Sequence, residues 1–168
     1  QTQDAVLGLA PHSLRAVTLE SLKEAIEGLN SLQPHSPIHI HIAEQMAEVN
    51  ACLQWCGKRP VELLLEQFDI NSRWCLVHAT HLNDTEIKQL AATGAVAGIC
   101  PSTESNLGDG IFNMPAWLAQ QGAWGIGSDS HVCVNAAEEL MLLEYSQRLN
   151  TQQRNVVKHE PYNDVATS

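Results

Sequence analysis

Short apolar runs alternate along this chain with stretches in which apolar residues recur every three or four positions. Runs of the first kind predict strands, and stretches of the second kind predict amphipathic helices. The predicted strands cover residues 5–10, 38–43, 74–79, 95–99 and 123–127. The predicted helices cover residues 19–32, 44–56, 60–68, 83–94, 115–121 and 135–149, and a long loop is predicted over 100–113. Strands that alternate with helices indicate a parallel sheet.

Two α/β architectures agree with this alternation. One is an open, doubly wound sheet of the flavodoxin type, which 168 residues would complete. The other is part of a (β/α)8 barrel, which takes about 250 residues when whole. Length favours the open sheet, and the pattern alone does not decide between the two.

Composition excludes several classes of partner. The formal net charge is −10, from 9 Lys and Arg against 19 Asp and Glu, which argues against nucleic acid and against anionic membranes. No apolar run reaches the roughly 18 residues of a membrane span. The five cysteines include no C-x-x-C pair, so a reduced, cytoplasmic compartment is expected.

Residues able to bind metal or move protons stand at the ends of three predicted strands. His41 ends one strand with Glu44 three positions later, His78 ends the next, and Asp129 follows the last. In parallel α/β folds the carboxyl ends of the strands form one rim, where active sites are built. A structural role remains open for each residue alone, such as helix capping by Asp129.

Taken together, these residue types favour metal-assisted hydrolysis. Imidazole and carboxylate suit Zn²⁺ or a similar divalent ion, so His41 and Asp129 are candidate ligands. A divalent ion lowers the pKa of water toward about 7. Asp129 is then the candidate base, Glu44 the group that carries a proton to a leaving nitrogen, and His78 the group that holds the attacking oxygen or polarises the substrate.

Four segments carry a resemblance to a known family. HIHIAEQ, RWCLVHATHL, AVAGICPSTESNLGDGIF and WGIGSDSH, in this order and spacing, resemble the amidohydrolase superfamily. Within it they look most similar to the formimidoylglutamate deiminases, over about residues 7–155. The resemblance implies a metal-dependent hydrolase with a (β/α)8 barrel, here incomplete, with about five β/α units that correspond to strands four to eight. Residues 1–150 would be the C-terminal part of that barrel and 151–168 a polar extension.

The resemblance also implies roles for individual residues. His41 and Asp129 match metal ligands, Glu44 matches the proton shuttle, and His78 matches the catalytic histidine of the sixth strand. In the segment APHSLRAV, His12 and Arg15 match residues that hold a substrate carboxylate. The implied cofactor is one divalent ion, which we expect to be Zn²⁺. The implied assembly is a homodimer. The implied reaction, a step of histidine degradation, converts N-formimidoyl-L-glutamate to N-formyl-L-glutamate and ammonia.

One feature of the superfamily is missing. An H-x-H pair on the first barrel strand supplies two further ligands, and nothing before His39 offers it. Three alternatives therefore stay open. They are a guanine-type deaminase of the same superfamily, a non-catalytic protein without metal, and a flavodoxin-like module, although APHSLRAV lacks the glycine of a phosphate-binding loop.

We expect the 168-residue chain alone to have negligible deiminase activity, because a catalytic zinc usually needs three protein ligands and only two candidates are present. The measurement is ammonia release from N-formimidoyl-L-glutamate by the purified chain. A rate near that of a full-length deiminase would contradict this expectation.

Overall fold

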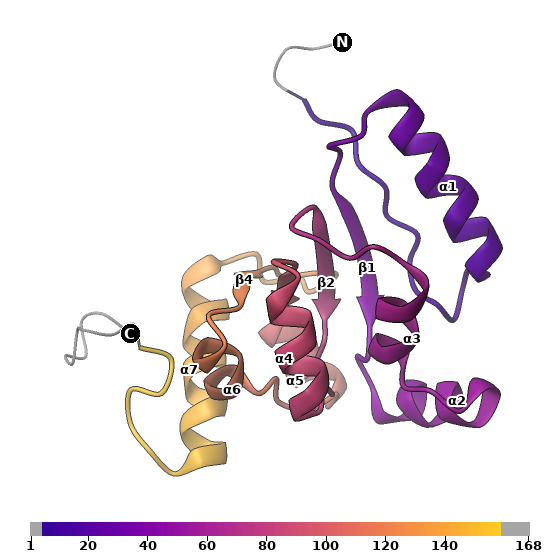
Figure 1. The fold of residues 1–168 in the computed structure, drawn as a ribbon. Helices are drawn as coiled ribbons and strands as arrows, with labels where there is room; N and C mark the ends of the chain where they lie inside the picture. Colours follow the sequence, from indigo (N-terminus) through magenta and orange to yellow (C-terminus); the bar gives the residue numbers. More distant parts are fainter. Residues whose placement is uncertain (1–4, 159–168) are drawn as a thin grey trace.

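The computed structural model describes residues 5–158, and its centre is a parallel sheet. Four strands lie side by side in the order β1-β2-β3-β4 (Figure 1). They are β1 (Ile38–Ile42), β2 (Trp74–His78), β3 (Val96–Ile99) and β4 (Ala123–Ile126). All three pairings are parallel, which confirms four of the predicted strands and the α/β class.

Helices connect and flank these strands. They are α1 (Leu19–Leu32), α2 (Met46–Cys56), α3 (Pro60–Gln67), α4 (Asp84–Ala92), α5 (Pro101–Leu107), α6 (Met114–Ala119) and α7 (Ala136–Thr151). Their ends follow local rules: Thr18 caps α1 through its side chain, and Asn83 with Glu86 forms a capping box on α4. In Figure 1, α1, α2 and α3 lie at the β1 end of the molecule, whereas α6 and α7 lie at the β4 end.

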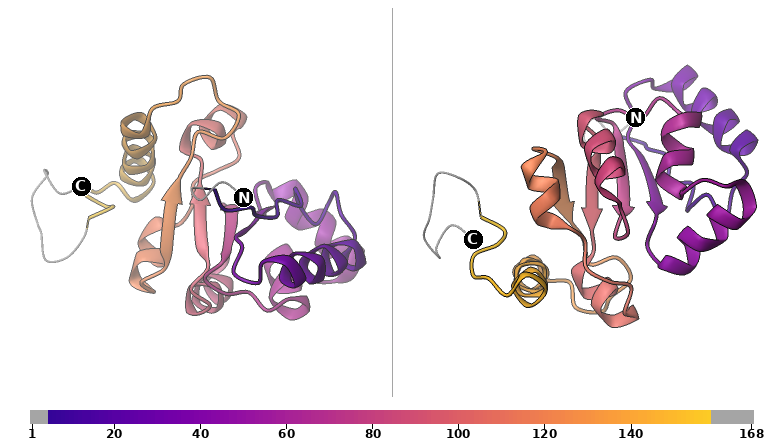
Figure 2. Two further views of the ribbon diagram at one scale, coloured as in Figure 1. Left: turned by 90° about the horizontal axis from the view of Figure 1, so that it is seen from above. Right: turned by 60° about the horizontal axis from the view of Figure 1, so that its bottom comes forward.

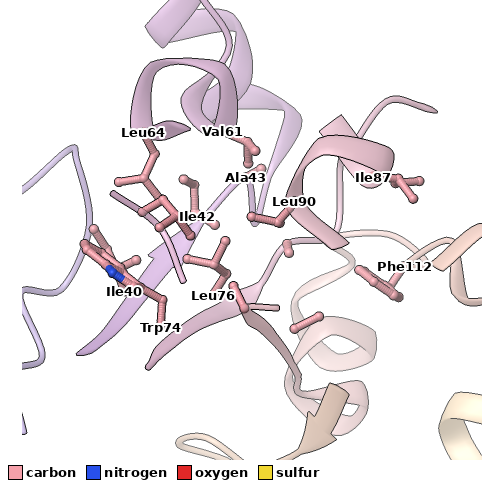
Figure 3. Packing of buried hydrophobic residues seen from close by; sticks show 14 of the residues in the cluster. Ile40, Ile42, Ala43, Val61, Leu64, Trp74, Leu76, Ile87, Leu90 and Phe112 are labelled. Carbon is pink, nitrogen blue, oxygen red and sulfur yellow. The ribbon is translucent and has the colours of Figure 1, made fainter. Parts of the chain in front are cut away.

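The hydrophobic core lies between one face of the sheet and the helices. Alternation along β1 buries Ile38, Ile40 and Ile42 and leaves His39 exposed and His41 partly exposed. Figure 3 shows Ile40, Ile42 and Leu76 packed among side chains from the helix layer, such as Leu64 and Leu90. The opposite face of the sheet therefore carries the two β1 histidines.

The predicted strand over residues 5–10 is wrong as a strand. This segment runs parallel to β1, but it pairs only through isolated bridges, Leu9 with Ile38 and Ser13 with His41. Between these bridges, Pro11 lacks a backbone N–H, and His12 has a positive φ of 44°. The ladder is interrupted there, so the sheet of residues 5–158 has four strands and not five.

The predicted loop over residues 100–113 is also wrong in its first half, because it contains α5. Pro101 starts this helix, where its missing N–H costs no hydrogen bond, and Gly108 ends it in the left-handed conformation. In the right panel of Figure 2, α5 lies beyond the arrowheads of the strands, and it packs against α7. It therefore faces the rim where the candidate site residues were expected.

Two expectations concern the ends and the environment of the chain. The predicted polar extension overlaps the end of α7 at Thr151, and its residues 159–168 lie outside the described part. Within residues 5–158, no helix combines the length and hydrophobicity needed to cross a membrane.

Candidate active site

Two histidine rings flank a third, that of His41, at the carboxyl ends of β1 and β2. The ring centroids of His12 and His41 are 4.9 Å apart, and those of His41 and His78 are 5.4 Å apart. His41 lies in β1 and His78 ends β2, whereas His12 lies in the segment that runs beside β1. The rim predicted from the sequence is thus present, and His12 belongs to it.

The backbone at this rim is unusual. His12, Ala43, His78, Ala79 and Asp129 all have positive φ angles, between 44° and 68°. Such conformations cost on the order of 1–3 kcal/mol each and persist only where surrounding contacts impose them. At His78 the positive φ accompanies a change in the direction of the side chain. This residue pairs with Ile42, which points to the core, yet its imidazole lies beside that of His41.

Two of the predicted catalytic carboxylates converge on the same nitrogen of His78. Its Nε2 lies 3.7 Å from Oε1 of Glu44 and 4.0 Å from Oδ2 of Asp129. The imidazole is almost fully buried, whereas the Asp129 side chain is 29% exposed. A reacting group placed between the two carboxylates would meet an acid, a base and an imidazole at once.

A third carboxylate, which the sequence analysis missed, holds the other nitrogen of this ring. Oε1 of Glu104 lies 3.2 Å from Nδ1 of His78 and also accepts the backbone N–H of Cys100 at 2.8 Å. Burial alone lowers the pKa of His78, but the hydrogen bond to Glu104 and the nearby carboxylates outweigh it, so the pKa lies above the ordinary value of 6.5. Glu104 therefore orients the ring and favours its protonated form.

Arg15 lies on the Glu44 side of the site. Its guanidinium is 3.4 Å from Glu44 and 3.9 Å from Glu48, and its side chain is 44% exposed. Glu48, which the sequence pattern did not identify as a site residue, is buried and accepts hydrogen bonds from the backbone N–H groups of Ala43 and Glu44. It fixes the turn that presents Glu44, while the exposed Arg15 remains able to exchange partners.

His41 and Asp129 fit a divalent metal ion in their chemistry. Nδ1 of His41 lies 2.9 Å from the backbone oxygen of His12. A carbonyl oxygen only accepts, so Nδ1 carries the hydrogen, and in the neutral form of the ring Nε2 has the free lone pair that a metal ion needs. A hydrogen bond of this kind fixes the tautomer of histidine ligands in metal sites. The Asp129 carboxylate would supply the second ligand.

Helix α5 is tied to the rest of the rim by further side chains that the sequence analysis did not single out. Ser102 donates both its backbone N–H and its hydroxyl to the buried carboxylate of Glu139 on α7. The hydroxyl of Thr103 donates to the backbone oxygen of Ser128, the residue before Asp129. One short helix thereby holds His78 through Glu104 and Asp129 through its preceding residue.

A second link joins three of the segments that carry the family resemblance. The side-chain amide of Gln45 donates to Oδ1 of Asp109 at 2.7 Å, and Nε2 of His81 donates to the Asp109 backbone oxygen. Gln45 follows Glu44 directly, and Asp109 follows α5. The β1 and β3 ends of the rim are therefore bridged beside the site.

The chain belongs to the amidohydrolase family, whose profile matches residues 2–168. It is 53% identical over 150 residues to formimidoylglutamate deiminase of Pseudomonas aeruginosa, which covers 89% of this chain and 32% of that protein. The crystal structure of an amidohydrolase from Brucella melitensis is 52% identical and superposes with a TM-score of 0.88, over 95% of this chain and 35% of that one.

The fold recurs in more distant proteins. An adenosine deaminase from Xanthomonas campestris with bound zinc superposes with a TM-score of 0.82 at 23% identity, over 93% of this chain and 36% of that one. The four-stranded sheet thus corresponds to part of a (β/α)8 barrel. The chain spans about a third of the length of the relatives that it matches.

We expect Glu104→Gln to destabilise the chain more at about pH 6 than at about pH 8. Because its folded pKa is raised, protonated His78 contributes stability that is present below the unfolded value near 6.5 and lost as the pH rises through the folded value. Without the Glu104 charge this contribution shrinks. The measurement is urea unfolding at both pH values, with the exposed Glu27→Gln as control. An equal loss at both values would contradict the role given to Glu104.

Proposed function

We propose that this chain is part of a metal-dependent deiminase that hydrolyses N-formimidoyl-L-glutamate to N-formyl-L-glutamate and ammonia. The observation that carries the proposal is the approach of Glu44 and Asp129 to one nitrogen of His78. The 53% identity to a formimidoylglutamate deiminase supports this substrate over others of the family. A place in histidine degradation, a cytoplasmic location and a homodimer stay predictions.

The metal ion is assigned to His41 and Asp129, with Zn²⁺ as the proposed identity. When bound, the ion supplies a Lewis acid that makes water a nucleophile at neutral pH. Imidazole and carboxylate are ligands that zinc accepts, and the Xanthomonas campestris deaminase of similar fold carries zinc. Other ligands would have to come from parts of the whole protein that this chain does not contain.

The side chains of this chain divide the proton transfers between them. Asp129 accepts a proton from the attacking water, and Glu44 delivers a proton to the terminal imine nitrogen of the substrate. The oxygen adds to the formimidoyl carbon. Asp129 then returns its proton to the nitrogen, the added hydroxyl gives its proton to Glu44, and the bond from the carbon to the terminal nitrogen breaks to release ammonia. His78, with its raised pKa, donates a hydrogen bond from Nε2 to the oxygen that gains charge.

The substrate carboxylates are assigned to Arg15 and His12. A guanidinium pairs with a carboxylate through two parallel hydrogen bonds, which suits the dianionic substrate. Arg15 forms an ion pair with Glu44. When the substrate binds, the guanidinium must therefore leave the Glu44 carboxylate and pair with a carboxylate of the substrate. Its 44% exposure makes the exchange inexpensive, because an exposed ion pair contributes little.

In the whole protein, Glu44→Gln should lower kcat by about 10²–10⁴-fold, because the amide does not transfer a proton to the leaving nitrogen. The metal content should stay unchanged, since Glu44 is not an assigned ligand. The measurements are ammonia release from N-formimidoyl-L-glutamate and metal analysis of the same sample, with Glu27→Gln as control. Retained turnover would refute the proton-shuttle role, and faster ammonia release from guanine would favour the guanine-type alternative.

Arg15→Gln in the whole protein should raise KM about 10–100-fold with a smaller change in kcat. Hydrogen bonds to charged groups contribute about 1.5–3 kcal/mol, and the substrate carboxylate would lose them. Steady-state kinetics measure the two constants separately, and the exposed Arg154→Gln is the matched control. A lower kcat at an unchanged KM would place the action of Arg15 on Glu44 and not on the substrate.

A further inference from the structure

Three side chains of different ligand types meet under the rim. They are His78 at the end of β2, Cys100 directly after β3, and Glu104 in the first turn of α5, and all three are buried. One ligand atom from each lies within 4.8 Å of the other two. Within the part of the chain that the structure describes, this is the one group of three metal-binding side chains that lies so close.

We propose that His78, Cys100 and Glu104 form a second site for a divalent ion of the zinc type, separate from the ion assigned to His41 and Asp129. Thiolate, imidazole and carboxylate are the three ligand types that zinc takes in proteins. Magnesium and calcium prefer sites made of oxygen alone. One thiolate and one carboxylate together neutralise a divalent charge, which a buried site requires.

The ligand atoms need only a small rearrangement. Zinc bonds of about 2.0–2.3 Å in a tetrahedral arrangement place ligand atoms roughly 3.3–3.8 Å apart. Nδ1 of His78 already lies 3.2 Å from one oxygen of the Glu104 carboxylate, Oε1. The described hydrogen bonds of Glu104 both end on Oε1, so Oε2 can meet the ion while Oε1 keeps the backbone N–H of Cys100.

Occupation of this site excludes the hydrogen bond between His78 and Glu104. The Cys100 thiol gives its proton to solvent, as thiols do on binding a metal ion. Nδ1 of His78 also loses to solvent the hydrogen that it shares with Glu104, and the neutral ring then carries its single hydrogen on Nε2. The ion and the orienting hydrogen bond are therefore alternatives. If the proposed function holds, excess zinc inhibits the whole protein by this route.

The test is spectroscopic and needs no enzymatic activity. The metal-free, reduced 168-residue chain is titrated with Co²⁺, which replaces zinc and absorbs in the near ultraviolet when a thiolate binds it. We expect this thiolate-to-cobalt absorption in the chain, its loss in Cys100→Ser, and its reversal by added Zn²⁺. Glu104→Gln should weaken Co²⁺ binding by at least about tenfold. Loss of a residue that only hydrogen-bonds to a metal ligand already weakens binding by about that factor, and Glu104 is itself a proposed ligand.

Three matched variants locate the signal. The absorption should persist in Cys75→Ser, which removes a half-buried thiol from the neighbouring strand β2. It should also persist in the double variant Cys52→Ser and Cys56→Ser. These two sulfur atoms lie 3.9 Å apart on α2, and neither belongs to the cluster of His78, Cys100 and Glu104. It should persist in His41→Asn, which removes a ligand of the proposed catalytic ion.

Two results would overturn the second site. One is an absence of thiolate absorption in the unmodified chain, which would leave His78 and Glu104 as a hydrogen-bonded pair only. The other is absorption that survives in Cys100→Ser with its helical circular dichroism unchanged. Neither result bears on the proposed deiminase reaction, because the kinetic variants at Glu44 and Arg15 test that reaction separately.

Discussion

The geometry of the rim depends on one buried carboxylate, that of Glu104. It accepts a backbone N–H at the start of α5 and faces the imidazole of His78, so the helix and the ring are fixed by the same group. His78 has a left-handed backbone, a conformation that an ordinary strand would not retain. Because the pair is buried, loss of either partner leaves the other unsatisfied, which costs more than the bond itself contributes.

Other residues of α5, the helix that contains Glu104, hydrogen-bond to elements far apart in the sequence. Ser102 binds Glu139 of α7, and Thr103 binds the backbone immediately before Asp129. A helix of seven residues therefore sets the relative positions of two catalytic candidates that come from different strands. Such support from fixed side chains is what holds reacting groups in place without cost at the moment of reaction.

The sequence predicted the rim but not what holds it. Alternation of apolar residues located β1 and β2, and the carboxyl ends of parallel strands then placed His41 and His78 together, as observed. Helix α5 was predicted as a loop because its polar composition offers no periodic apolar face. Because the helix was not predicted, Glu104 was not identified as a site residue. Glu48 was not identified because its buried contacts are with backbone N–H groups. Contacts of this kind leave no pattern in the sequence.

Charge completes the physical picture of the site. Three carboxylates, those of Glu44, Glu104 and Asp129, surround one imidazole that carries at most a single positive charge. The exposed Arg15 offsets only part of the remainder, because water screens it. Carboxylates gathered in a partly buried site favour either a proton or a cation among them. The excess of negative charge raises the pKa of His78, so that the imidazole holds a proton more firmly. The same excess of negative charge favours the binding of a divalent ion at this rim.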